Sequence, residues 1–176
     1  MKNQLIATLV VGLILFIWQF LSWAALNIHR AEMQYTENQD AILANLAENL
    51  KPGTYFLPQA APGEDQQAAM ARYEGKPYAA IHYRPSMNTG MGMQLVRGFA
   101  VDLVSAFLLV WLLLNFRDLS LKKVLLAAWA VGGIAYLTIP YLNSIWYETN
   151  TFGHIVDWIV QWGLIGVWLG WWLTRK

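Results

Sequence analysis

The stretch from Leu5 to Leu26 decides the class of protein. It reads LIATLVVGLILFIWQFLSWAAL, and only Thr8, Gln19 and Ser22 interrupt its apolar side chains. A helix of about 20 mostly apolar residues crosses the roughly 30 Å of hydrocarbon in a bilayer. The run is longer than the roughly 7–15 apolar residues of a signal-peptide core. We therefore interpret residues 1–26 as a transmembrane helix that is retained as a signal anchor.

Three further apolar stretches meet the same length requirement, at residues 98–116, 124–142 and 155–173. Four such helices in a chain of 176 residues would leave a soluble protein without polar faces to cover them. Hydrophobic residues make up 57% of the chain and charged residues 13%, against about 45–50% and about 25% in soluble domains. The sequence predicts a mainly α fold, a four-helix transmembrane bundle.

The same composition excludes several classes of function. The net charge is +1 and there is no cysteine. A disordered chain, a basic nucleic-acid-binding domain and a disulfide-stapled module are therefore ruled out. The chain has no phosphate-binding glycine loop, GxSxG, HExxH or CxxC motif. We expect a protein that is not an enzyme and that needs no cofactor and no metal.

Orientation follows from the charges of the short loops and the tails. Their basic residues are Lys2, Arg117, Lys122, Lys123, Arg175 and Lys176. The other short loop, residues 143–154, has no Lys or Arg. The positive-inside rule then places both termini in the cytoplasm and residues 27–97 outside, in the periplasm if the membrane is a bacterial inner membrane. All ten tryptophans lie in or beside the four apolar stretches, as in an aromatic belt.

Residues 27–97 have an ordinary soluble composition, and we expect them to form a small extracytoplasmic α/β insertion between the first and second membrane helices. A capping box at Thr36 opens a helix that Pro52 and Gly53 end. Short β-type runs at 54–57 and 78–83 flank a second helical stretch, and we expect them to pair. Such a cap is either structural or a surface for docking or sensing.

Five polar residues lie in or beside the apolar stretches, and they form a predicted polar cluster in the outer half of the membrane: Gln19, Asp102, His154, Asp157 and Gln161. Such residues usually face a bundle interior or a water-filled path. Three interpretations stay open: hydrogen bonds between helices, ion or proton handling, and contact with another subunit. Four glycines are predicted to let helices pack closely, namely Gly132, Gly133, Gly166 and Gly170.

Three short segments, GTYFLP at 53–58, AAIHYRP at 79–85 and QLVRG at 94–98, resemble small four-span bacterial inner-membrane proteins of uncharacterised function. That resemblance implies the same architecture and no particular activity. From size and the missing catalytic motifs we predict a non-catalytic accessory or scaffold subunit of a larger membrane complex, with lipid and protein partners or a homo-oligomer. The alternative is a small ion or solute transporter that uses Asp102 and Asp157.

Overall fold

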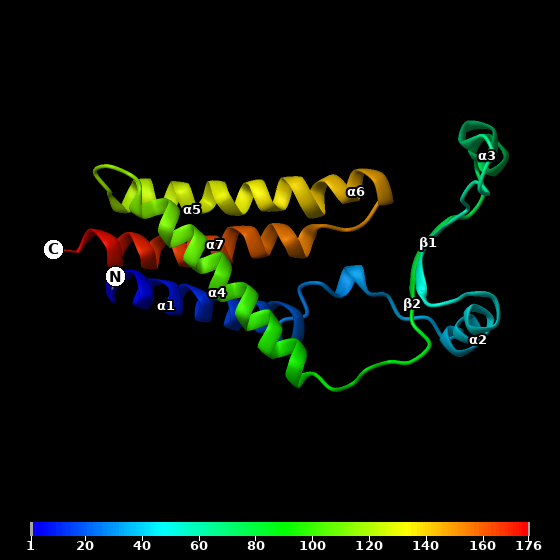
Figure 1. Ribbon diagram of the computed structural model, residues 1–176, viewed down its shortest axis with the longest axis horizontal. Coiled ribbons are helices and arrows are strands. Elements are labelled where there is room, and N and C mark those ends of the chain that lie inside the picture. The colour runs from blue at the N-terminus through cyan, green and yellow to red at the C-terminus, as the bar shows by residue number, and fades with distance from the viewer. Residues whose placement is uncertain (1, 176) are drawn as a thin grey trace. The chain divides into compact units, whose positions relative to one another are not determined.

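The computed structural model describes residues 2–175 and is 68% helical. Helix α1 spans Lys2–Phe20, and a π-helical segment, η1, continues it over Leu21–Ala25. Helix α4 spans Gly92–Leu114 and helix α7 spans Phe152–Thr174. Between them, α5 (Leu121–Tyr136), η3 (Leu137–Tyr141) and α6 (Leu142–Tyr147) form one continuous helical stretch (Figure 1).

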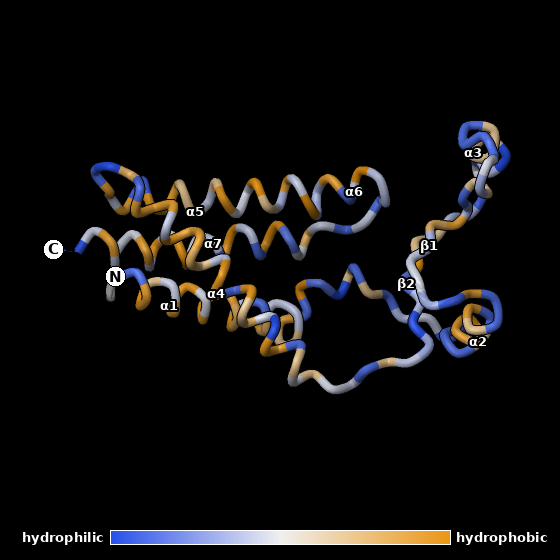
Figure 2. Tube along the Cα trace, viewed as in Figure 1, coloured by the Kyte–Doolittle hydropathy of each residue, from blue (hydrophilic) through white to orange (hydrophobic). Residues whose placement is uncertain are grey.

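Four helices are thus long and apolar enough to cross a membrane, as the sequence predicts. Figure 2 shows hydrophobic residues along all of them and hydrophilic residues in the turn between α4 and α5. Their ends differ from the prediction. The second begins at Gly92, six residues earlier than expected, and the third continues to Tyr147, past its predicted end at residue 142.

Pro140 is accommodated by a local change in helix geometry. It lies inside η3, where the backbone widens into π-helical turns. The hydroxyl of Thr138 donates to the carbonyl of Ile134 at 2.6 Å. A local change of turn width lets a helix pass a proline, which lacks a backbone N–H donor, so the helical stretch continues into α6 instead of becoming the predicted loop.

The chain divides into two compact units, and the larger one holds the four long helices, with residues up to Gln34 and from Gly90 onward. Within it, α5 packs along α7, α7 along α1, and α1 along α4. The buried core of this unit is aliphatic and includes Val11, Ala106, Val110, Leu113, Ile165 and Leu169. The four predicted packing glycines lie against side chains of the neighbouring helix: Gly132 against Trp162, Gly133 against Trp158, Gly166 against Leu125, and Gly170 against Leu121.

The second unit, Tyr35–Thr89, contains the predicted order of helix, strand, helix and strand. Its elements are α2 (Gln39–Asn49), β1 (Gly53–Leu57), α3 (Gln66–Tyr73) and β2 (Ala79–Tyr83). The two strands pair antiparallel, with Tyr55 opposite Ile81. The buried hydrophobic side chains of this unit are Ala69 and Tyr83, so its own core is very small.

Candidate functional site

A group of interacting polar side chains lies where α1 ends and α7 begins, and Asp157 of α7 is its first member. Trp18 and Ser22 are four residues apart and therefore lie on one face of the helix. The indole nitrogen of Trp18 donates to Asp157 Oδ1 at 2.9 Å, and the hydroxyl of Ser22 donates to the same oxygen at 2.6 Å. The other oxygen, Oδ2, lies 2.9 Å from Nε2 of His29.

His29 reaches Asp157 because the chain folds back after η1. Asn27 adopts a left-handed conformation with φ of 51°, and the amide of Ile28 donates back to the carbonyl of Ser22. A single 3₁₀ turn, η2 (Arg30–Glu32), follows directly. His29 thereby lies at the end of the helix that supplies Trp18 and Ser22, and its side chain is only 1% exposed.

Glu32 joins two histidines. Its Oε1 lies 2.7 Å from Nδ1 of His29, and its Oε2 lies 3.2 Å from Nε2 of His154 at the start of α7. The order of contacts is Asp157, His29, Glu32, His154, and we refer to these four residues as the His29 cluster. Both carboxylates are mostly buried, and His154 is the most exposed member.

Trp23 and Gly153 both restrict the position of the His29 ring. On one face the indole of Trp23 is stacked on it, with ring centroids 3.8 Å apart and planes inclined by 3°. Close to the ring lies Gly153, where an added Cβ would come within 2.5 Å of Nδ1 of His29. Only glycine at position 153 leaves room for the imidazole, so the ring position is set by packing as well as by hydrogen bonds.

The two carboxylates of the His29 cluster need positive charge nearby to balance them. A neutral imidazole has one N–H donor, yet both ring nitrogens of His29 lie within hydrogen-bonding distance of a carboxylate oxygen. Buried carboxylates that stay charged need paired cations or a metal. The cluster can therefore hold protons on its imidazoles or a cation between its ligand atoms. One ligand atom each from His29, His154 and Asp157 lies within 4.8 Å of the others.

The five predicted polar residues do not form one hydrogen-bonded group. Asp157 and His154 belong to the His29 cluster, while Asp102 accepts a hydrogen bond from the amide of Gln19 at 3.0 Å. Among the described residues, Oδ2 of Asp102 is buried and has no hydrogen-bond partner. Gln161 is buried in α7, on the same helix as His154 and Asp157.

Sequence reasoning missed half of the His29 cluster and its supporting residues. His29 and Glu32 have the i, i+3 spacing of an interacting pair, and Trp18 and Ser22 have i, i+4 spacing, but these signals are common. These residues reach α7 only because the chain reverses at Asn27, and no local sequence pattern predicts that reversal.

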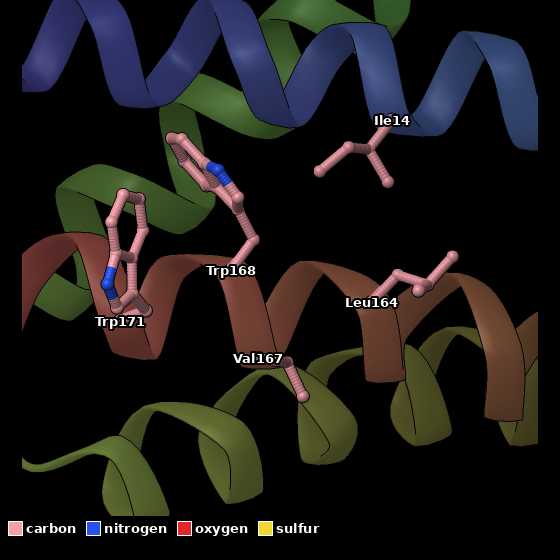
Figure 3. A pocket seen from close by; sticks show the side chains of 5 residues that line it. All are labelled: Ile14, Leu164, Val167, Trp168 and Trp171. Atoms are coloured by element: carbon pink, nitrogen blue, oxygen red, sulfur yellow. The ribbon is translucent and has the colours of Figure 1, made fainter.

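The helical unit also has an apolar pocket of about 410 Å³ between α1 and α7 (Figure 3). Ile14 of α1 faces Leu164 and Trp168 of α7 across it, with Val167 and Trp171 alongside. None of these side chains is charged or can act as an acid or base, so the pocket offers no chemistry of its own.

No protein-family model matches the chain, and no similar curated protein or solved structure was found. The function is therefore inferred from the residues and their geometry.

Proposed function

We propose that this chain is a multi-pass protein of a bacterial inner membrane and a non-catalytic accessory subunit of a larger membrane complex. In this proposal both termini are cytoplasmic, and the Tyr35–Thr89 unit is periplasmic and docks a partner protein. The observation that carries it is the incomplete core of that unit.

The helix α2 provides the clearest support for a partner. Its apolar residues recur on one face, and both Ile42 and Leu43 are exposed within the unit. No residue of α2 is buried. Burial of apolar surface contributes about 25 cal/mol per Å², so a helix with an uncovered apolar face gains stability when another surface covers it. Monomeric soluble domains rarely leave such faces open.

Charge favours a protein partner over a lipid surface for this face. Between residues 27 and 92 there are seven acidic and five basic side chains. An anionic membrane surface attracts segments rich in Lys and Arg, and an excess of acidic residues opposes that attraction.

Site-specific photocrosslinking in native membranes tests the docking role. A photoreactive residue at Leu43, on the apolar face of α2, should give an adduct of one defined mass. The same probe at Glu48, on the opposite face of α2, is the matched control and should give little or none. Equal yields at the two positions, or no adduct at either, would overturn the accessory role.

The absence of cysteine makes the topology directly testable. A single cysteine in place of Glu74 should react with a membrane-impermeant maleimide in intact spheroplasts. A single cysteine in place of Lys122 should react only after the membrane is permeabilised. The reverse pattern would invert the proposed orientation.

Transport through the helical unit is a second candidate, favoured by one observation. Asp102 is buried among apolar helices, and one of its oxygens has no hydrogen-bond partner in the described part of the chain. Ionisable residues in such places often mark ion or proton paths. Proteoliposomes should then show an ion flux that Asp102→Asn or Asp157→Asn abolishes, and an unchanged flux would exclude this candidate.

A further inference from the structure

We propose that the His29 cluster is a binding site for a divalent transition-metal ion, and that Zn²⁺ is the ion its ligand atoms fit best. The ligand residues are His29, His154 and Asp157, and one ligand atom from each lies within 4.8 Å of the others. We assign Nε2 to His29 and Oδ2 to Asp157, the two atoms that face each other at 2.9 Å. Three protein ligands leave the fourth position of a tetrahedral zinc ion to water or to another group. This site goes beyond the accessory role and does not depend on it.

The ligand atoms of Asp157 and His29 are already selected by hydrogen bonds on the other side of each residue. Oδ1 of Asp157 is occupied by Trp18 and Ser22, which leaves Oδ2 for the ion. Nδ1 of His29 contacts Glu32 at 2.7 Å, and when it donates there, the lone pair of Nε2 faces Asp157. Metal-binding histidines almost always donate their second N–H to a carboxylate, a carbonyl or water, and ligating carboxylates are themselves hydrogen-bonded.

The distances require only a modest rearrangement. With metal–ligand bonds of about 2.0–2.1 Å, tetrahedral ligand atoms lie about 3.4 Å apart. Nε2 of His29 and Oδ2 of Asp157 are 2.9 Å apart, and the remaining separations are at most 4.8 Å. His29 is fixed by Trp23 and Gly153. His154 is the most exposed of the three, so the adjustment falls to its side chain, whose Nε2 now lies 3.2 Å from Glu32.

Charge supplies an independent reason for a divalent ion. Glu32 and Asp157 bring two negative charges into a mostly buried cluster, and one divalent cation balances them while both imidazoles stay neutral. The rival arrangement places an extra proton on each imidazole and binds no metal.

The types of ligand atom in the His29 cluster indicate which metal ions it would bind. Two imidazole nitrogens and one carboxylate oxygen suit Zn²⁺ and its neighbours in the first transition row, whereas Mg²⁺ and Ca²⁺ prefer oxygen ligands. Co²⁺ is therefore a suitable spectroscopic substitute, because a tetrahedral nitrogen and oxygen environment gives it visible absorption.

The test uses the full-length protein in detergent, purified without a histidine tag and stripped with a chelator. Titration of Zn²⁺ against a chromophoric chelator should give one ion per chain. His154→Gln and Asp157→Asn should each weaken binding by at least about 100-fold, because loss of even a supporting residue typically costs 10–100-fold. The matched control is His82→Gln, which removes the remaining histidine, located on β2 and hydrogen-bonded to Thr54, and it should leave zinc affinity unchanged.

Two measurements keep the proposal falsifiable if a variant fails to fold. X-ray absorption of the Co²⁺-loaded wild-type protein should show two imidazole ligands, and Zn²⁺ should raise its melting temperature. A spectrum with oxygen ligands only, failure of the stripped protein to bind one ion, or equal zinc affinity in wild type and folded His154→Gln would each overturn the site and leave the protonated cluster as the alternative.

Discussion

Replacement of Gly166 by alanine probes how closely α5 and α7 approach each other. A Cβ at position 166 would lie 2.7 Å from Cδ1, 3.0 Å from Cα and 3.3 Å from the carbonyl oxygen of Leu125. Carbon atoms pack best at about 3.5–4.0 Å. The Cδ1 atom can move aside by side-chain rotation, but the Cα atom belongs to the backbone of α5, so the two helices must separate by about 0.5 Å or more.

A control on the same helix isolates the packing cost. An added Cβ at Gly163 would meet only Nε1 of Trp129, at an ordinary 3.7 Å. Both substitutions gain the same helix propensity of alanine over glycine, about 0.8–1 kcal/mol, which cancels in the comparison. Overpacking costs about 1–3 kcal/mol, and each kcal/mol shifts Tm by about 2–4 °C in a protein of this size. Gly166→Ala should therefore melt about 2–12 °C below Gly163→Ala.

The assay is thermal unfolding in one detergent, followed by far-UV circular dichroism and by tryptophan fluorescence. Both variants need the same elution volume on size exclusion as the wild type before unfolding is compared. If Gly166→Ala melts at the same temperature as Gly163→Ala, the backbones of α5 and α7 do not approach as closely as described and the reasoning fails.

Three further predictions follow from single contacts. Gln19→Leu removes the donor to Asp102 and should cost about 1–3 kcal/mol of unfolding free energy; adding Asp102→Leu should recover most of that loss, because both partners are then apolar. Glu32→Ala should weaken zinc binding by about 10–100-fold in the chelator titration, since it removes the carboxylate that orients His29. Asp65→Ala removes the side-chain cap on the amide of Ala68 and should cost about 1 kcal/mol, seen as faster hydrogen exchange in α3 and not in α7.

The helices and strands were predictable from the sequence where a single local signal dominated. Long apolar runs determine the four helices, and turn residues such as Pro52 and Gly53 mark where elements of the insertion end. The predicted capping box at Thr36 was wrong, because α2 begins at Gln39 and its N-cap, Asn38, makes no side-chain capping hydrogen bond. The predicted end of the third stretch at residue 142 was too early, because a π-helical segment around Pro140 carries the helix on to Tyr147. Proline is a strong stop signal on its own, and the π-helical geometry that accommodates Pro140 is a property of the folded backbone.

Two of the four residues of the His29 cluster were predictable from the sequence, again because a local signal marks them. His154 and Asp157 stand out because polar residues in an apolar helix are costly and therefore conspicuous. His29 and Glu32 lie just beyond the first helix, where polar residues are ordinary, so nothing in their composition marks them.

The amino-acid sequence by itself determined the four long apolar helices and the small α/β insertion, because each depends on residues that are neighbours along the chain. Only the tertiary structure decided which polar residues meet. It paired Gln19 with Asp102 and joined Asp157 to His29, a residue 128 positions away in the chain. Such contacts depend on the chain reversal after η1 and on the packing of α1 against α7, and no local pattern encodes either of them.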